Sequence, residues 1–344
     1  MNPIRGVVVA GVAASGVAHG ADLFVPSKSY STIQSAVDAA NDGDTIHLAA
    51  GQFVESVLVQ GKSIVIRGAA QQSTIWRAPK GLQCLSIPDG SVIPFELSDL
   101  TVTGSASTYG HASVDLQGSG AKRVVRCTFS QNSGWAALNV YGDGSTVADC
   151  LFVQNGLGAS IAFGQGISMQ RCEFRDNSQT QSAGGGPWAP ADLDAYACTL
   201  SVQQCQFING SSDGAPVRVY ATVDFDQCAF SSGEGGVASA IQAYDSVATV
   251  RLGQTSFCES PEPRLAGTAR FIDLGGNSVS EFCAPLCPAD LVPDNTVNGA
   301  DIAIVLNFWG TDGSQFPGVD IDADGIVNGA DLAAVLNAWG PCQQ

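Results

Sequence analysis

Charged side chains are scarce in this sequence. Only 14% of the 344 residues are Asp, Glu, Lys or Arg, and only two residues are methionine. Basic residues are missing from positions 287–344, which hold eight aspartates, and the whole chain has a net charge of −17. This charge repels phosphate backbones and acidic headgroups, so it argues against nucleic acid as a partner, whereas calcium is its natural counter-ion. The 40 glycines and the 45% apolar share instead favour a folded, β-rich exported protein.

Long hydrophobic runs are absent as well. An apolar run from Val7 to Ala18 is too short for a membrane span, which needs about 20 apolar residues, and no later segment is longer and as apolar. The run follows an early arginine, and the small residues Ala18 and Gly20 stand at the third and the last position before Ala21. This is the pattern of a secretory signal peptide over residues 1–20. We therefore expect no transmembrane segment and a secreted chain, extracellular or associated with a cell surface, that starts near Ala21.

Eleven cysteines in an exported chain suggest disulfides, but five of them share one local frame, Cys-x-Phe. These five are Cys127, Cys150, Cys172, Cys205 and Cys228, and their positions differ in turn by 23, 22, 33 and 23. A period near 23 with one short alternating strand is typical of one coil of a parallel β-solenoid. Alternation places the cysteines and phenylalanines inward, so we expect them to be buried and stacked rather than bridged. We expect the Asn or Gly at the fifth position after each cysteine to take a left-handed turn.

A second strand follows the first in each coil. The sequence predicts it at Ala137–Tyr141, Ser160–Phe163, Val217–Tyr220 and Ala240–Tyr244. We predict that its outward column contains no carboxylate cluster and consists of Asn139, Ala162, Arg218 and Gln242.

The first coil of such a stack needs a cover, because it would otherwise expose apolar groups and unpaired backbone. Residues 31–34 have the pattern of a capping box that starts at Ser31, with Gln34 as its reciprocal residue, and apolar residues follow at helical spacing. We expect a short amphipathic helix that plugs this end, followed by a first strand over Thr45–Leu48.

The segments 30–37, 43–46, 51–55 and 62–68, together with the Cys-x-Phe repeats, resemble right-handed parallel β-helix proteins. Pectate lyases, polygalacturonases and pectin methylesterases share that architecture. The resemblance covers residues 24 to about 280 and implies a fold rather than an activity. We therefore expect an all-β chain with a right-handed parallel β-helix over 21–280, a linker over 281–286, and a small α-helical calcium domain over 287–344.

The C-terminal region has oxygen donors at calcium-binding spacing. Gly325 permits the sharp bend of a loop whose positions 1, 3, 5, 7, 9 and 12 are Asp320, Asp322, Asp324, the Ile326 carbonyl, Asn328 and Asp331. An earlier copy of the loop lacks the ligand at position 3; its donors are Asp290, Asp294, Asn298 and Asp301. The sequence thus predicts bound Ca²⁺, held more weakly in the earlier loop.

Each loop leads into a helix, Asp301–Trp309 or Asp331–Trp339, and we expect the apolar faces of these helices to pack on each other. Asp at position 12 and the near-duplication of the loop, at 290–301 and 320–331, resemble type I dockerin domains. This resemblance implies a cohesin-like or cell-surface anchoring protein as partner. Cys287 and Cys342 frame the span, and we expect them to form a disulfide that closes a domain with little core of its own.

Catalytic signatures are mostly missing from the coils. The segment 51–55 resembles pectin methylesterases, but no stretch follows that provides their two aspartates. Gly110-His111-Ala112 is only a fragment of the polygalacturonase set, and no Asp-Asp pair occurs. A calcium-dependent lyase needs only carboxylates that hold Ca²⁺ and a nearby base. The outward residues that offer this mixture are Asp149, Arg171, Glu173 and Arg175, and a surface salt-bridge ladder is the alternative interpretation.

The longest coil, between Cys172 and Cys205, contains an insertion over residues 179–199. Its Trp188, Asp192, Asp194 and Tyr196 could contact a glycan, because aromatic faces stack on sugar rings and carboxylates bond hydroxyls. The alternative is an irregular loop that covers the sheet.

Two hypotheses follow from the sequence. The first is a dockerin-tethered, pectate-lyase-like β-helix that binds an extracellular, uronate-type polysaccharide. Whether it also cleaves the polymer stays open, and the missing motifs favour a polysaccharide lyase over a glycoside hydrolase. The second is a non-catalytic structural or adhesive surface protein that is attached through its dockerin.

Overall fold

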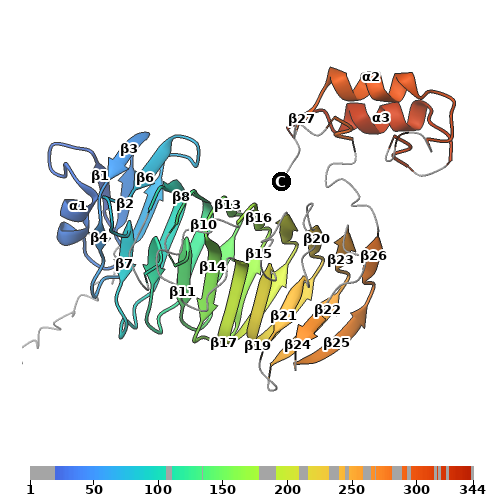
Figure 1. Ribbon diagram of the computed structural model, residues 1–344. Helices are drawn as coiled ribbons and strands as arrows, with labels where there is room; N and C mark the ends of the chain where they lie inside the picture. The colour runs from blue at the N-terminus through green and yellow to red at the C-terminus, as the bar shows by residue number, and fades with distance from the viewer. Residues whose placement is uncertain are drawn as a thin grey trace, which may run out of the picture.

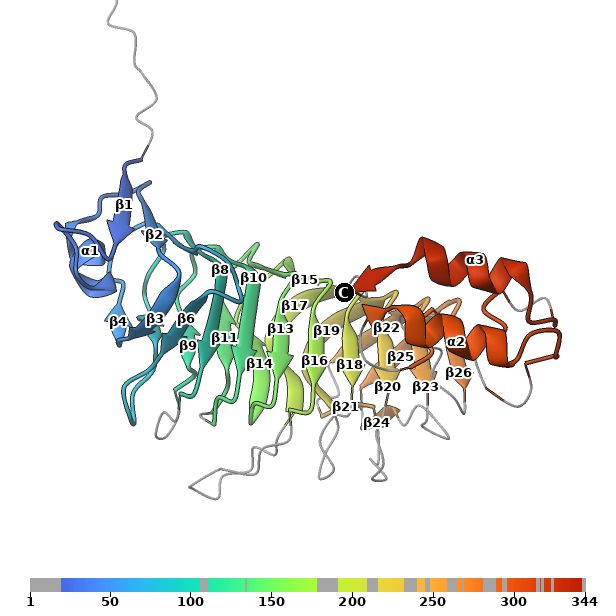
Figure 2. The same ribbon diagram turned by 90° about the horizontal axis from the view of Figure 1, so that it is seen from above.

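The computed structural model describes residues 20–105, 111–133, 135–177, 191–208, 216–231, 240–244, 248–258, 265–267, 269–280, 289–292, 296–313, 316, 319–322 and 325–341. Most of this part of the chain is a stack of short parallel strands, each paired with strands one coil before and one coil after (Figures 1 and 2). The strands form three ladders that run the length of the stack.

The three ladders share four long strands, which continue from one ladder into the next. The first ladder consists of β1 (Asp22–Val25), β2 (Thr45–Leu48), β5 (Val65–Gly68), β8 (Phe95–Thr103), β10 (Lys122–Ser130), β12 (Thr146–Ala148), β15 (Ile167–Gln170), β17 (Ala191–Gln203), β19 (Val217–Asp226), β22 (Thr249–Gly253) and β25 (Arg270–Gly275). The second consists of β3 (Gly51–Val54), β6 (Thr74–Arg77), β8, β10, β13 (Leu151–Val153), β16 (Glu173–Arg175), β18 (Gln206–Ile208), β20 (Ala229–Ser231), β23 (Ser256–Cys258) and β26 (Ser278–Ser280). The third consists of β4 (Val57–Leu58), β7 (Leu85–Ile87), β9 (Val114–Leu116), β11 (Leu138–Tyr141), β14 (Leu157–Ala162), β17, β19, β21 (Ile241–Ala243) and β24 (Leu265–Gly267).

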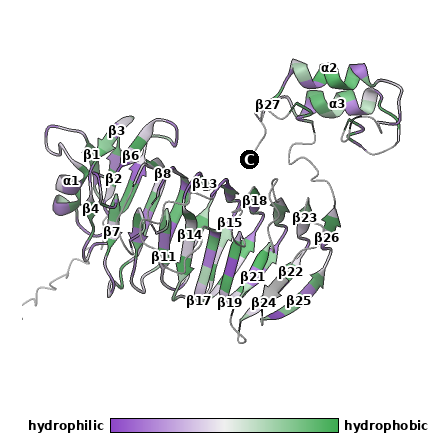
Figure 3. Ribbon diagram, in the orientation of Figure 1, coloured by the Kyte–Doolittle hydropathy of each residue, from purple (hydrophilic) through white to green (hydrophobic). Residues whose placement is uncertain are grey.

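Each coil visits the three ladders in turn, which gives a right-handed solenoid of about nine coils. Hydrophobic and hydrophilic residues alternate along its strands, as Figure 3 shows. The predicted β-solenoid and its period are confirmed, because residues about one period apart pair directly, as Phe129 does with Phe152.

The core of the stack contains a column of phenylalanine rings that supports the predicted inward frame. Neighbouring rings are nearly parallel, with centroids 4.6–5.0 Å apart. Its members are Phe129, Phe152, Phe174, Phe207, Phe230 and Phe257. The five cysteines of the repeat are buried and free, so they act as small apolar residues rather than bridges. Cys258, outside this set, is disulfide-bonded.

In the three repeats that end on asparagine, the turn differs from the prediction by one residue, while the predicted turn residues of the other two, Gly210 and Gly233, lie outside the described residues. The left-handed residues are Gln131, Gln154 and Asp176, with φ of 54°, 55° and 53°, and each precedes the predicted asparagine. The asparagines are buried and hydrogen-bonded from coil to coil: Asn132 Nδ2 donates to Asn155 Oδ1 at 3.0 Å, and Asn155 Nδ2 donates to Asn177 Oδ1 at 2.9 Å. An amide side chain can both donate and accept a hydrogen bond. A buried asparagine can therefore bond to the coils on both sides of it, which a residue at the exposed turn would not do.

At the N-terminal end, helix α1 (Ile33–Ala39) packs against β1, β2 and β4, and its apolar residues join the solenoid core. Its N-cap is Thr32 with Ser35 as the reciprocal residue, not Ser31 with Gln34 as predicted. The Glu55 carboxylate accepts hydrogen bonds from the free amides of Ile33 and Gln34, which shifts the start of the helix by one residue. Strand β2 has the predicted bounds, but β1 precedes it and was missed.

The C-terminal region has a small core of its own between helices α2 (Gly299–Asn307) and α3 (Gly329–Asn337), near the antiparallel pair β27 (Thr296–Val297) and β28 (Gly340–Pro341). Val305 and Val335 are buried in it, but the rest of each predicted contact face is only partly buried or exposed. The prediction that the whole faces pack together was wrong for four exposed side chains, Leu306, Trp309, Leu336 and Trp339. Leu306 and Leu336 lie on the solvent side of their helices. Trp309 and Trp339 lie beyond the helix ends, because the helices end at Asn307 and Asn337 and not at the two tryptophans as predicted. Within the described residues, no helix has the length and apolar character needed to cross a membrane.

Candidate functional site

The predicted lyase candidates form two separate ion pairs on the outside of the coils. The Arg171 guanidinium donates two hydrogen bonds to the Asp149 carboxylate, with Nε–Oδ1 and Nη2–Oδ2 distances of 2.6 and 2.9 Å. This hydrogen bonding raises the pKa of Arg171, so the guanidinium loses its proton even less readily than a free arginine and is less available to accept one from a substrate. Glu173 pairs with Arg175 on β16, and burial raises the pKa of Glu173. Asp149 and Arg171 thus pair from one coil to the next, as the surface salt-bridge ladder of the alternative interpretation requires, whereas Glu173 is buried and pairs within its own strand.

The same pairing recurs in earlier coils at the corner between the first two ladders. Arg126 donates to both carboxylate oxygens of Asp99, with an Nη2–Oδ2 distance of 2.7 Å, and this lowers the pKa of Asp99. Arg126, Asp149 and Arg171 all have left-handed backbone, with φ of 52°, 55° and 49°. These charges therefore belong to a repeated corner of the fold.

The four glycan candidates of the insertion have different environments. Trp188 lies outside the described residues. Asp192 is completely buried, and its Oδ1 accepts a hydrogen bond of 2.9 Å from Asn177 Nδ2. We call the hydrogen-bonded column of Asn132, Asn155 and Asn177 the asparagine ladder, and Asp192 occupies its next place. Burial raises the pKa of Asp192 to about 8. Asp194 is also buried, whereas Tyr196 is 47% exposed.

Asp194 belongs to a polar column on the outer side of the third ladder, which the sequence prediction described incompletely. The register aligns Asp115, Asn139, Ser160, Asp194, Arg218 and Gln242 in successive coils. The predicted Ala162 lies two residues further along, level with Tyr141. The column therefore contains two carboxylates, Asp115 and Asp194, that the predicted list left out, and they are three coils apart.

The polar column is a largely enclosed layer. Arg218 donates to both oxygens of Asp194 at 2.9 and 3.0 Å, and burial raises the pKa of Asp194 while Arg218 opposes that rise. Asp115 accepts hydrogen bonds from Asn139 Nδ2 at 2.8 Å and from Gln117 Nε2 at 3.0 Å. Within the column only Gln242 is partly exposed and the other five residues are buried, so most of the column lies beneath the molecular surface.

Beside this column, five aromatic side chains form a continuous row with one ring per coil. We call Tyr141, Phe163, Tyr196, Tyr220 and Tyr244 the aromatic row. Neighbouring ring centroids are 5.1, 5.4, 5.9 and 4.7 Å apart. Phe163, Tyr196 and Tyr244 are 55%, 47% and 44% exposed. Large apolar rings are rarely left in solvent as a contiguous group unless they meet a ligand or partner.

Phe163 joins the row from a left-handed corner that recurs in the next coil, where Ala197, the residue after Tyr196, has φ of 48°. The position in register with Tyr141 and Tyr196 is Ala162, whose methyl group would leave a gap between the rings. Phe163, the next residue, has φ of 50°, a conformation that bulky residues rarely adopt. Its ring fills the gap and contacts both Tyr141 and Tyr196 edge to face.

Sequence reasoning missed the aromatic row, although its signal was present. Each of the four predicted second strands ends on a tyrosine or phenylalanine, namely Tyr141, Phe163, Tyr220 and Tyr244. A repeated aromatic at the last position of equivalent strands indicates a row of rings when the strands stack. Of the five rings in the row, the sequence prediction included only Tyr196 among its ligand contacts.

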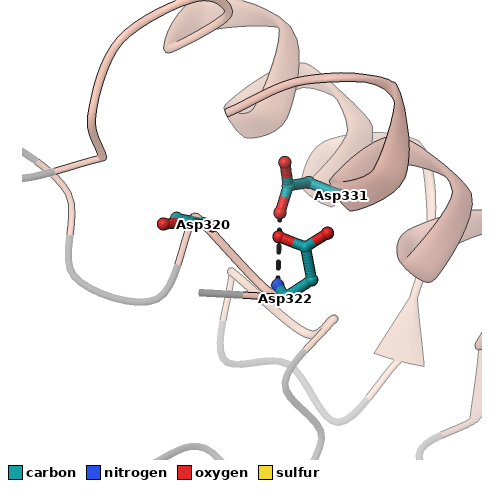
Figure 4. A group of neighbouring side chains, drawn as sticks. All are labelled: Asp320, Asp322 and Asp331. Carbon is teal, nitrogen blue, oxygen red and sulfur yellow. Dashed lines mark hydrogen bonds between the residues drawn. The ribbon is translucent and has the colours of Figure 1, made fainter. Parts of the chain in front are cut away.

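The described part of the predicted calcium loop brings three carboxylates together. Oxygens of Asp320, Asp322 and Asp331 lie within 4.8 Å of one another (Figure 4). Two oxygens that bind one Ca²⁺ at about 2.3–2.6 Å are at most about 5.2 Å apart, so this donor set fits the ion. Gly325 has φ of 88°, as the bend requires. Asp324 lies outside the described residues.

Asp331 also organises the start of helix α3. Its Oδ1 accepts hydrogen bonds from the amides of Ile321 and Asp322 at 2.6 and 3.3 Å, and its Oδ2 accepts one from Asn328 at 2.7 Å. These bonds lower the pKa of Asp331 against the effect of burial. Asn328 caps the helix through its side chain and donates to the Ile326 carbonyl.

The earlier loop repeats this arrangement in part. Asp301 Oδ1 accepts a hydrogen bond from the Val292 amide at 2.8 Å, and its Oδ2 accepts one from Asn298 at 2.7 Å. Asp290 is nearly buried. Asp294, Cys287 and Cys342 lie outside the described residues, as do the linker 281–286 and residues 1–19.

Known proteins resemble this chain in fold at low sequence identity. A pectin methylesterase from Aspergillus niger is 12% identical with a TM-score of 0.45, covering 74% of this chain and 90% of that chain. The tailspike protein gp49 of Acinetobacter baumannii bacteriophage Fri1, a capsular polysaccharide depolymerase, is 12% identical with a TM-score of 0.41, covering 76% of this chain and 57% of that chain. A mutant of the PL6 family alginate lyase AlyGC is 14% identical with a TM-score of 0.39, covering 80% of this chain and 42% of that chain. This chain thus spans less than two thirds of the tailspike protein.

A search of curated proteins finds no match to the sequence. A family model described as a right handed beta helix region matches residues 85–254. Over those residues the described coils pair in parallel along three ladders. The family model and the structure agree that this part of the chain is a right-handed β-helix.

Proposed function

We propose that this chain is an exported protein that binds an extracellular polysaccharide on its β-helix and attaches to a partner through a calcium-dependent C-terminal region. The observation that carries the proposal is the aromatic row, because five adjacent rings, exposed or partly exposed on a rigid sheet, offer a polymer a repeated stacking surface. In this proposal helix α1 covers the first coil, and the signal segment 1–20 directs the chain out of the cell.

Binding is supported better than cleavage. Asp115 and Asp194 are three coils apart, about 14 Å at about 4.8 Å per coil. This exceeds the separation of about 5–9.5 Å at which paired carboxylates hydrolyse a glycosidic bond. Asp192 and Asp194 are closer along β17, but both are buried and hydrogen-bonded to neighbours. The non-catalytic hypothesis therefore gains support over a lyase, whose predicted base Arg171 is paired with Asp149.

The calcium part of the proposal rests on the donor set of the later loop. Asp320, Asp322 and Asp331 would hold Ca²⁺, together with Asp324, the Ile326 carbonyl and Asn328. The ion would neutralise the clustered carboxylates and fix the loop against helix α3. The earlier loop, with Asp290, Asp294, Asn298 and Asp301, would bind more weakly because Val292 replaces a ligand.

Anchoring is supported by exposed residues at the C-terminal ends of the two helices and just beyond them. Leu306 and Trp309 follow the earlier loop, and Leu336 and Trp339 occupy the equivalent positions after the later one. Four large apolar side chains left in solvent on so small a domain suit a protein partner. A cohesin-like or cell-surface anchoring protein is the partner we propose.

Binding and cleavage are tested with the full chain from Ala21 and a panel of soluble polysaccharides. Affinity electrophoresis should show retardation by at least one polymer, and Tyr220→Ala should reduce it. The exposed Phe24, which stacks on His47 in the first two strands, provides the matched control as Phe24→Ala. No retardation by any polymer would refute the proposed binding, and release of unsaturated, ultraviolet-absorbing product would refute a purely non-catalytic role.

A further inference from the structure

We infer that the aromatic row binds an uncharged polysaccharide, running along the solenoid axis, rather than a uronate polymer. This inference rests on the proposed function and specifies the class of ligand. Two independent observations carry it, namely the direction of the row and the charges around it, and the side chain of Phe163 adds to the continuity of the row.

The row runs along the solenoid axis, because each ring comes from a different coil. Four steps of about 4.8 Å make a continuous strip about 19 Å long from the first ring to the last. The ring-to-ring distances of 4.7–5.9 Å leave no break in it. A strip of this shape matches an extended polymer that lies along the axis and presents the apolar faces of its sugar rings.

The charges near the row disfavour an anionic polymer. Between residues 127 and 250 the sequence contains only three basic residues, Arg171, Arg175 and Arg218. In the structure each of them is paired with a carboxylate, and Arg218 is buried with Asp194. The segments 178–190, 209–215, 232–239 and 245–247 contain no Lys or Arg at all.

A uronate polymer carries one negative charge per sugar and needs cations or bridging metal ions to bind a protein. The chain here has a net charge of −17 and offers no unpaired arginine among the described residues of this span. Long-range repulsion would also slow the approach of such a polymer. Neutral sugars meet no such barrier and gain from stacking on the rings.

The backbone of Phe163 belongs to a repeated corner of the fold. Ala197, the residue after Tyr196 in the next coil, has φ of 48°, close to the 50° of Phe163, and it carries no ring. The corner therefore sets the left-handed backbone, and the feature particular to Phe163 is a large side chain at a conformation that disfavours a residue with a Cβ. Its ring lies where the register supplies only Ala162.

The experiment compares neutral and anionic polymers at equal chain length. The full chain from Ala21 is titrated by calorimetry with β-glucan, xylan and mannan fragments and with polygalacturonate and alginate fragments, with calcium and with chelator. We expect binding to at least one neutral glycan that is unchanged between low salt and high salt and insensitive to chelator. Tyr196→Ala or Tyr220→Ala should weaken it about tenfold, whereas Phe24→Ala should leave it unchanged.

Phe163→Gly separates a binding role from a structural one. We expect it to weaken glycan binding while the unfolding midpoint stays equal or rises, because glycine relieves the left-handed strain. Phe163→Tyr should retain binding. A lower midpoint with unchanged glycan affinity would overturn a binding role for this ring.

The outcomes separate the inferred preference for neutral glycans from the proposed polysaccharide binding on which it rests. Tighter binding of polygalacturonate or alginate than of neutral glycans, weakened by salt or chelator, would overturn the inference and leave polysaccharide binding standing. Absence of binding to both classes would overturn the inference and the proposed function together.

Discussion

The replacement Asp192→Asn tests whether the asparagine ladder is continued by a protonated carboxyl group. Asp192 is completely buried, Asn177 Nδ2 donates to its Oδ1 at 2.9 Å, and within the described structure no group donates to or accepts from its Oδ2. Burial raises its pKa from 3.8 to about 8. At pH 7 the folded protein therefore holds a neutral carboxyl group, which takes the place of an asparagine side chain.

The folded-state pKa lies above the unfolded value, so the stabilising contribution of this carboxyl is complete only below the unfolded pKa of 3.8. It is lost progressively as pH rises towards 8, because the unfolded chain releases the proton first. A difference of about four pKa units at about 1.36 kcal/mol each sets a ceiling of about 5 kcal/mol for this loss. Asparagine has no proton to release, so Asp192→Asn should remove the pH dependence.

The assay is denaturant-induced unfolding of the full chain and of Asp192→Asn at pH 4.5 and pH 8, with calcium held constant. We expect the variant to be more stable than the parent at pH 8 by a few kcal/mol and nearly equal to it at pH 4.5. Other titrating groups are common to both proteins and cancel in the comparison. Equal destabilisation by the substitution at both pH values would refute the protonated state, because it would mean that an ionised Asp192 is stabilised in the fold.

Four further outcomes are expected. Arg218→Met should lower the free energy of unfolding by about 3–5 kcal/mol because it leaves Asp194 buried and unpaired, and a second change, Asp194→Leu, should restore most of it in denaturant titrations. Phe152→Ala should cost about 3–5 kcal/mol by opening a cavity in the ring column, and a loss below about 1 kcal/mol would contradict its close packing. Arg171→Gln should change stability by less than about 1 kcal/mol and leave glycan affinity unaltered, since its ion pair is exposed; a loss of glycan affinity would restore the lyase-site hypothesis. Chelation of calcium should make the C-terminal helices sensitive to protease while the coils resist, and Asp331→Ala should have the same effect; identical digestion patterns with and without calcium would count against the metal loop.

The sequence by itself determined the features that depend on local spacing. The regular recurrence of the Cys-x-Phe frame, with Cys and Phe two positions apart, was enough to predict the coils and the buried, free cysteines, because alternation along a strand is a property of the strand alone. The spacing of Asp320, Asp322 and Asp331 likewise predicted that their carboxylates approach one another, since a short loop brings its own donors together.

Only the tertiary structure decided which residues of successive coils meet on the outer surface. A slip of one residue moves a side chain to the opposite face of a sheet, and neighbours in a column are separated by a whole coil of sequence. The sequence therefore placed Ala162 in the polar column instead of Ser160, and it left Asp194 outside the column because the insertion concealed the register. The aromatic row depends on the same register and on the left-handed corner at which Phe163 and Ala197 lie. The sequence of one coil does not reveal this corner, because its register with the next coil is fixed only when the coils stack.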